Sequence, residues 1–458
     1  MAASLFDPLL AEGLTSLRIR HDWRTGRSGA LASKDWEPDL AFGRYAADFD
    51  LETELTGSPV LLDDSATRAL YRREGAEGAL DGLLDLLREG RHQGIDLWVH
   101  SPLGIRVISN MHSDVPGLGN GRHAIRAGGI RRHGPADAEE EVLVDGLNLA
   151  RAMSFKNVAA RVPYGGSKIC VHSEPVALDD LEALGFLAWC IDRSRSCTGP
   201  DMGFDPRHAD VLRAHFTRAI VGGPAGALGP TGAPTARGVL LALRGAVSDH
   251  LGRDGLAGLS VAIQGLGAVG APLATALLGE GVSRLLVADQ EACRRASFLD
   301  SLGEADRART EVVDPTEVLT AEVDILSPNA VGGVLGPDEI DALRCRIVMG
   351  AANNQLRAVS QAEELALAER LDSRGVLYQV DWMHNSAGVI AGCEEYEHQE
   401  SASMERVEAH LEQVCGEGVA QNLAAARSEA ITPTAMAYTR VAEAIYPGEG
   451  QARGEARA

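Results

Sequence analysis

Lysine is nearly absent from this sequence. The chain of 458 residues has 43 basic side chains but only three lysines, Lys34, Lys156 and Lys168, so the other 40 are arginines. Arginine cannot lose its proton in a protein, whereas lysine can. Lys156 and Lys168 lie only twelve positions apart, with the Gly165–Gly166 pair between them. This placement favours a chemical need for amines over a chance cluster of surface residues.

Three other shortages exclude whole classes of protein. The seven cysteines are scattered without a C-x-x-C pair, which indicates reduced thiols and predicts neither a disulfide framework nor a metal site. No apolar run approaches the roughly eighteen residues of a membrane span, and the first thirty residues lack a signal-peptide core. The net charge of -22 disfavours nucleic acid and anionic membranes as partners. We therefore expect a cytoplasmic protein whose partners are small molecules.

The length predicts two or three domains, and the pattern of elements favours an α/β protein. A hydrophobic fraction of 45% and a charged fraction of 24% are typical of globular chains, and 458 residues exceed one small core. A glycine- and proline-rich stretch at residues 222–234 separates two patterns. Before it, apolar spacing predicts helices at 80–91 and 136–161 and strands at 95–99, 104–110 and 168–171. After it, the βαβ alternation predicts strands at 259–264, 284–288, 323–326, 346–349 and 376–379, with helices at 268–278 and 432–446.

These elements suggest four segments. We expect residues 78–223 to form a substrate-binding α/β domain and residues 224–395 a Rossmann-type, doubly wound dinucleotide-binding domain. Residues 1–77 carry no motif and are left as an unassigned N-terminal extension. Residues 396–458 are expected to form helices that pack back on the substrate domain.

A glycine-rich motif follows the first predicted strand of the second domain. It has the form G-x-G-x-x-G: Gly265, Gly267 and Gly270, with Ala268 and Val269 between the last two. The first glycine permits a tight turn, the second lets the backbone approach a pyrophosphate, and the third allows close packing of helix on strand. A helix N-terminus then faces the phosphates. The alternative is a glycine turn used only for packing.

An acidic residue closes the next predicted strand. Asp289 lies 19 residues after Gly270, where a carboxylate that binds a ribose belongs. Such a carboxylate accepts hydrogen bonds from a 2′-hydroxyl and repels a 2′-phosphate. The sequence therefore predicts NAD as the cofactor and makes NADP less favoured, although Arg294 and Arg295 lie nearby.

The lysine segment and the glycine motif together resemble the glutamate/leucine/phenylalanine/valine dehydrogenase family, over about residues 95–446. The resemblance rests on an ordered set of segments: residues 127–131, 152–157, 163–168, 198–201, 235–239, 350–356 and 384–389. It implies reversible oxidative deamination, in which an L-amino acid, NAD and water give a 2-oxo acid, ammonium and NADH. It also implies a homo-oligomer with the active site in the cleft between two domains.

The resemblance assigns roles to individual residues. Lys156 matches the lysine that holds the substrate α-carboxylate, Lys168 the lysine that activates water, and Asp201 the aspartate that handles protons on the substrate amine. An amine acts as a base near neutral pH only where burial or nearby charge lowers its pKa. Gly128 and Gly129 are expected to bring backbone N–H groups to the α-carboxylate. Three further positions match cofactor or substrate contacts: Thr235 and Asn353 for the cofactor, and Asn385 beside the amino acid and nicotinamide.

Two small residues distinguish the expected substrate pocket. In the glutamate-specific branch a lysine binds the side-chain carboxylate at the position of Ala127, and a serine lies at the position of Gly392. Without that cation a substrate carboxylate would be buried unpaired, which costs several kcal/mol. We therefore expect an apolar substrate, bulky or aromatic. Two alternatives stay open: a glutamate dehydrogenase with a rearranged carboxylate site, and a catalytically silent NAD-binding scaffold.

Overall fold

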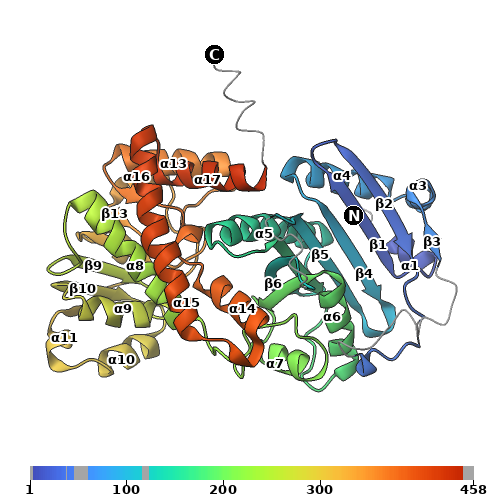
Figure 1. Cartoon of the computed structure of the whole chain (residues 1–458), viewed down its shortest axis with the longest axis horizontal. Helices are drawn as coiled ribbons and strands as arrows, with labels where there is room; N and C mark the ends of the chain where they lie inside the picture. The colour runs from blue at the N-terminus through green and yellow to red at the C-terminus, as the bar shows by residue number, and fades with distance from the viewer. Residues whose placement is uncertain (1–3, 38, 46–59, 116–122, 447–458) are drawn as a thin grey trace, which may run out of the picture. The chain divides into compact units, whose positions relative to one another are not determined.

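The computed structural model describes residues 4–37, 39–45, 60–115 and 123–446. The chain divides into two compact units, drawn in Figure 1. Unit 1 comprises residues 1–158, 162–229 and 392–402, and unit 2 comprises residues 159–161, 230–391 and 403–458. The boundary at residues 229 and 230 falls inside the glycine- and proline-rich stretch that the sequence singles out.

Unit 1 is built on an eight-stranded mixed sheet in the order β3-β2-β1-β4-β5-β7-β6-β8. Strand β6 runs parallel to both β7 and β8, whereas the other neighbours are antiparallel. The strands are β1 Ser16–Asp22, β2 Arg27–Ser33, β3 Leu61–Leu62, β4 Gly94–His100, β5 Ile105–Ser113, β6 Arg126–His133, β7 Gly165–His172 and β8 Ser196–Pro200.

Both faces of this sheet are covered, because side chains alternate along each central strand. In β4, Leu97 packs into one apolar cluster with residues of α4 and α5, while Trp98 packs into another with residues of α6. Strand β7 is buried along its whole length. The helices are α1 Asp7–Ala11, α3 Asp64–Arg73, α4 Glu77–Gly90, α5 Glu139–Ala159, α6 Leu181–Arg193 and α7 Pro206–His215, with short 3-10 turns η1 Phe42–Arg44, η2 Ser101–Leu103 and η5 Gln399–Ser401.

The first 77 residues belong to unit 1 and are not a separate extension. Leu17 and Ile19 of β1 are fully buried and pair with Leu97 and Ile95 of β4. The sequence missed these strands because β1 also carries two arginines and a histidine, which obscure its alternation.

The Gly165–Gly166 pair opens β7. A Cβ at Gly165 would lie 1.9 Å from the Ser113 carbonyl oxygen, and a Cβ at Gly166 would lie 2.2 Å from the Ser154 nitrogen. Glycine is needed here because other main chains approach the strand closely.

Unit 2 contains a six-stranded, fully parallel sheet in the order β11-β10-β9-β12-β13-β14. In chain order this is 3-2-1-4-5-6, the doubly wound arrangement of dinucleotide-binding folds. The pair β9 and β10 lies side by side in Figure 1. The strands are β9 Ser260–Gln264, β10 Arg284–Ala288, β11 Thr310–Val312, β12 Ile325–Pro328, β13 Ile347–Val348 and β14 Leu377–Tyr378.

The C-terminal helices between residues 404 and 445 belong to unit 2 and pack against other helices of that unit. Val419 and Leu423 of α16 join the same apolar cluster as Val239 and Leu243 of α8. The helices are α8 Gly232–Leu251, α9 Gly270–Gly279, α10 Ala292–Asp300, α11 Glu304–Ala308, α12 Pro337–Ala342, α13 Gln361–Ser373, α15 Met404–Leu411, α16 Val419–Glu429 and α17 Pro433–Ile445, with 3-10 turns η3 Val318–Thr320 and η4 Asp381–Met383 and a π-helical turn η6 Glu412–Gly418. Helix α14, Ala387–His398, begins in unit 2, and its residues from 392 onward belong to unit 1.

Two further features concern cysteines and membranes. All seven cysteines are free, and Cys293 is exposed. Among the described residues, none of the helices combines the length and the apolar character that crossing a bilayer requires.

A pair of buried histidines makes the stability of unit 1 depend on pH. The rings of His92 and His112 meet edge to face at 5.1 Å. Burial, then Arg151 and His21, lowers the pKa of His92 to about 3; burial, then His92 and Arg151, puts the pKa of His112 well below its usual value. Below pH 6.5 the unfolded chain binds protons that the folded chain does not, so folding stability falls as the pH falls from 6.5 toward 3.

We expect the free energy of unfolding to drop by about 2 kcal/mol for each of these histidines between pH 7 and pH 5. Urea denaturation at the two pH values measures the drop. The variant His92→Asn, which does not titrate in this range, should lose about 2 kcal/mol less than the wild type. Equal losses in both proteins would contradict the assignment.

Candidate active site

Unit 1 brings Lys168 and Asp201 together. Lys168 lies in the middle of β7 with its side chain 5% exposed, and its ammonium donates a hydrogen bond to Asp201 Oδ2. Asp201 directly follows β8, and its backbone N–H donates to the carbonyl oxygen of Ile130 on β6 at 2.9 Å. Three adjacent strands therefore fix this pair, which is the lysine and the aspartate singled out by the sequence.

Gly129 provides the space that the pair occupies. A Cβ at this position would lie 2.9 Å from Lys168 Nζ, 3.3 Å from the Gly199 carbonyl oxygen and 3.5 Å from Asp201 Cβ. Its neighbour Gly128 also has no room for a side chain, since a Cβ there would lie 2.0 Å from the Ser167 carbonyl oxygen. Both glycines thus serve close packing around the pair; a contact of their N–H groups with a substrate stays a prediction.

The charge of Asp201 is set by two cations. Burial alone would raise its pKa, but Lys168, by charge and by hydrogen bond, and then Arg131 lower the pKa of Asp201 to about 2. Arg131 Nε donates to Asp201 Oδ2 at 3.1 Å, so the same oxygen receives both cationic partners. Asp201 is consequently a carboxylate throughout the neutral and alkaline range.

Arg131 extends the site in a way that the sequence did not predict. Its Nη1 donates to both oxygens of Asp145 on α5, at 3.1 and 3.0 Å, and Asp145 Oδ2 lies 3.2 Å from His133 Nε2. Arg131 follows Gly129 by two residues, and in a strand this spacing places both on one face. The alternation of side chains along the strand could have indicated Arg131 from the sequence. No sequence pattern indicated that Asp145, on a separate helix, would bind it.

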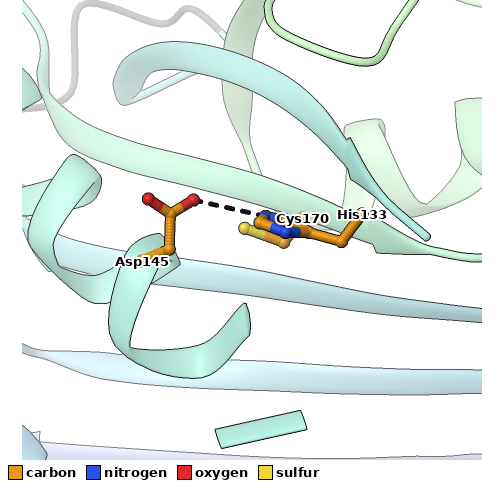
Figure 2. A group of neighbouring side chains, drawn as sticks. All are labelled: His133, Asp145 and Cys170. Carbon is orange, nitrogen blue, oxygen red and sulfur yellow. Dashed lines mark ion pairs between the residues drawn. The ribbon is translucent and has the colours of Figure 1, made fainter. Parts of the chain in front are cut away.

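His133, Asp145 and Cys170 also form a group with metal-ligand chemistry, shown in Figure 2. Their ligand atoms lie within 4.8 Å of one another. Both oxygens of Asp145 already accept from the Arg131 guanidinium, and a divalent cation would lie beside that fixed positive charge. The group is better described as an ion-pair network around Asp145 than as a metal centre.

Lys156 lies half-buried in the last turn of α5. The residue after it, Asn157, is buried, and its side-chain amide donates to the Ala127 carbonyl oxygen at 3.0 Å and to the Gly165 carbonyl oxygen at 2.6 Å. These bonds tie the end of α5 to β6 and β7, the strands that carry Gly129 and Lys168. The helix end that bears Lys156 is thereby fixed beside β6 and β7.

Ala127 and Gly392 both adjoin Cys197. Ala127, 4% exposed, pairs with Cys197 across β6 and β8, and the Cys197 thiol lies 3.9 Å from the Gly392 carbonyl oxygen. A Cβ at Gly392 would lie 3.2 Å from Val221 Cγ2. Unit 1 therefore gathers these two small residues, far apart in sequence, beside Cys197 and Val221.

The three motif glycines of unit 2 occupy three different environments. Gly265 has a φ of +92° between β9 and α9, a backbone conformation that favours glycine. A Cβ at Gly267 would meet only Arg294 Nη1, at 3.8 Å, which leaves the main chain accessible. A Cβ at Gly270 would lie 1.9 Å from the Gly265 carbonyl oxygen. Turn, open backbone and close packing are the three roles a pyrophosphate-binding loop requires.

Asp289 closes this loop at the end of β10. One of its oxygens accepts from the Leu266 backbone N–H at 2.7 Å and the other from the Glu291 backbone N–H at 2.8 Å. Arg294 lies 3.9 Å from Asp289 and 2.9 Å from Glu291, so its charge is shared between two carboxylates. These contacts hold the carboxylate beside the glycine loop.

The other residues predicted to contact cofactor also lie in unit 2. Thr235 is in the first turn of α8, and that turn packs on the loop, since a Cβ at Gly232 would lie 2.2 Å from the Ala268 carbonyl oxygen. Asn385 Nδ2 donates to Asn353 Oδ1 at 2.9 Å. Asn385 Oδ1 is buried without a hydrogen-bond partner, and a polar ligand group could satisfy it.

A parallel sheet in dinucleotide-binding order, a glycine-rich phosphate loop and a buried lysine–aspartate pair define a dinucleotide-dependent dehydrogenase. Residues 226–447 match the glutamate/leucine/phenylalanine/valine dehydrogenase family. Phenylalanine dehydrogenase from Bacillus thermotolerans is 33% identical over 297 residues, which are 64% of this chain and 73% of the relative. L-tryptophan dehydrogenase from Nostoc punctiforme is 32% identical over 312 residues, 67% of this chain and 81% of the relative.

The crystal structure of the Nostoc punctiforme L-tryptophan dehydrogenase is similar as well. It has a TM-score of 0.65 at 26% identity and covers 79% of this chain and 98% of its own. The chain therefore belongs to the glutamate/leucine/phenylalanine/valine dehydrogenase family, and within it to the leucine/phenylalanine type.

Proposed function

We propose that this chain catalyses the reversible, NAD-dependent oxidative deamination of an apolar L-amino acid with a bulky or aromatic side chain. The amino acid, NAD⁺ and water give the 2-oxo acid, ammonium, NADH and a proton. The observation that carries the proposal is the buried Lys168–Asp201 pair beside Gly129, in a chain that also holds a complete phosphate-binding loop. Relatives named for phenylalanine, tryptophan and leucine support the choice of substrate class.

Each residue has a proposed task. Lys156 binds the α-carboxylate, Lys168 takes a proton from the attacking water, and Asp201 exchanges protons with the substrate nitrogen. A buried amine can act as such a base, and a positioned base typically contributes about 10²–10⁴-fold to the rate. Ammonium leaves after water has added to the carbon that lost its hydride.

The nucleotide fits the loop of unit 2. The uncrowded backbone at Gly267 and the N-terminus of α9 would hold the pyrophosphate, and Asp289 would accept from the ribose hydroxyls. When bound, NAD⁺ supplies the hydride acceptor. Asp289 would repel a 2′-phosphate, and Arg294 is already shared between Asp289 and Glu291, so NADP is the weaker cofactor.

The pocket residues predict the order of substrates. Ala127 and Gly392 lie beside Cys197 and Val221, and none of these four residues has a side chain that can pair with a carboxylate. An unpaired substrate carboxylate costs several kcal/mol, so leucine, phenylalanine or tryptophan should exceed glutamate in kcat/KM by at least about a hundredfold. Steady-state kinetics with an amino-acid panel measures this ratio.

Ala127→Lys tests the same pocket by adding the cation that the wild-type chain lacks at this position. The added cation should lower activity on the apolar substrates and narrow their advantage over glutamate. Ala362→Lys, at an exposed position of α13, is the matched control and should leave the ratio unchanged. A wild-type preference for glutamate would refute the pocket argument and favour a rearranged glutamate dehydrogenase.

We also propose that the protein is a homo-oligomer in the cytoplasm, as the family resemblance implies. Light scattering on the purified protein measures its assembly, and fractionation of cells measures its location. A monomer, or recovery in the membrane fraction, would contradict these proposals.

A further inference from the structure

Asp201 needs a cationic partner besides Lys168. Under the proposed function, Lys168 gives up its proton during each turnover and is then a neutral amine. Asp201, with its side chain 31% exposed, would be left as a largely buried carboxylate beside an uncharged partner. Leaving a buried charge without its partner is strongly unfavourable.

Arg131 is placed to prevent this. Its side chain is 15% exposed, and both Nε and Nη2 lie 3.1 Å from Asp201 Oδ2, the oxygen that also accepts from Lys168. A guanidinium stays protonated at every pH the enzyme meets. Asp201 therefore keeps one permanent cationic partner whether or not Lys168 carries its proton.

Asp145 and His133 hold that guanidinium in place. Asp145 accepts from Arg131 Nη1 with both oxygens, and His133 Nε2 lies 3.2 Å from Asp145 Oδ2, the pair joined by the dashed line in Figure 2. Asp145 belongs to α5, the helix that also carries Lys156. The network thus connects the helix of the proposed carboxylate-binding lysine to the lysine–aspartate pair.

We propose that Arg131, held by Asp145, is a positioning residue that keeps Asp201 paired and thereby allows Lys168 to release its proton. The inference rests on the proposed function and deepens it. With Arg131 present, the guanidinium neutralises part of the negative charge of Asp201, so Asp201 attracts the Lys168 proton less strongly. Without Arg131, Asp201 acts on that proton alone, and the proton is harder to remove.

The charged and titratable groups around Lys168 come from four elements. They are Asp201 after β8, Arg131 and His133 on β6, Cys170 on β7 and Asp145 on α5. Burial raises the pKa of the Cys170 thiol to about 12, so this group stays neutral in the working range. Asn110 on the neighbouring β5 is uncharged and donates to the Lys168 carbonyl oxygen at 3.2 Å.

The test is the pH dependence of kcat/KM for Arg131→Met with the best amino acid of the panel. We expect a loss of about ten- to a hundredfold at pH 8 and an acid limb displaced upward by about one pH unit, because removing a nearby cation makes an ammonium harder to deprotonate. The loss should therefore shrink at more alkaline pH. Arg131→Lys, which keeps a charge but loses the planar fork, should restore most of the position of the acid limb.

Two controls make the result decisive. Arg244→Met removes a comparable arginine, which pairs with Glu280 in unit 2, and should leave the profile unchanged. Arg131→Gln also removes the cation but keeps a polar side chain; it should displace the acid limb in the same direction and serves where Arg131→Met does not fold.

Two outcomes would overturn the inference: an unchanged kcat/KM in Arg131→Met, or a loss that is equal at every pH and accompanies a lower Tm, which indicates a purely structural role. Wild-type turnover tests the proposed function separately, because this inference depends only on the ratio of each variant to the wild type.

Discussion

Lys168→Ala is expected to lower kcat/KM by at least about a hundredfold, and by as much as about 10⁴-fold, because it would remove the base proposed to activate water. The side chain is buried and bonded to Asp201, so an exposed lysine elsewhere in the chain cannot take its place. Lys168→Arg should be nearly as inactive, since arginine keeps the charge but cannot release a proton. Low activity in both variants would show that a positive charge at this position is not enough and that a group able to release a proton is required.

Initial rates of NADH formation and thermal unfolding of each variant provide the measurements. Lys34→Ala is the matched control, because Lys34 pairs with Glu37 away from the strands of the site and should be dispensable. Small primary amines added to Lys168→Ala should restore part of the rate by occupying the vacated space. Full activity in Lys168→Arg would remove this residue from proton transfer.

Gly129→Ala is expected to lower kcat by about a hundredfold while the protein stays folded. The new Cβ would lie 2.9 Å from Lys168 Nζ, so the ammonium must move by several tenths of an ångström from its bond with Asp201. A misplacement of about 1 Å in a reacting group can cost roughly 10²-fold. The atom that must yield is the end of a flexible side chain, which is why the fold should tolerate the change.

Kinetics and Tm of Gly129→Ala measure the effect, with Gly29→Ala as the control. Gly29 lies in β2, in the same sheet, with open space where a Cβ would be. The control should show wild-type kinetics. Unchanged kcat in Gly129→Ala would mean that the position of Lys168 Nζ is not critical.

The nucleotide loop could be predicted from sequence because its determinants are local. Gly265, Gly267 and Gly270 follow one apolar strand, and Asp289 ends the next, so both parts lie within one βαβ unit. Hydrophobic spacing likewise placed α4, β4, α5 and β10 within a few residues. Lys168 and Asp201 were identified by resemblance, and the structure brings them into contact.

The parts that sequence missed depend on pairing over long distances. Strand β1 pairs with β2 and is connected to the rest of the sheet through β4, about eighty residues later, and its mixed polarity hides it. The proposed role of Arg131 requires both the register of β6 beside β8 and the placement of Asp145 on α5. The C-terminal helices were assigned to the other unit because their apolar faces do not reveal which partner they cover.

The most direct test of the account is the stoichiometry of the wild-type reaction. Purified protein is given NAD⁺ with leucine, phenylalanine or tryptophan at alkaline pH, and NADH and ammonium are measured together. The account predicts that at least one of these amino acids yields NADH and ammonium in equal amounts, and that Lys168→Ala yields neither. Tight binding of NAD⁺ without NADH formation from any amino acid would contradict it and identify a silent NAD-binding protein.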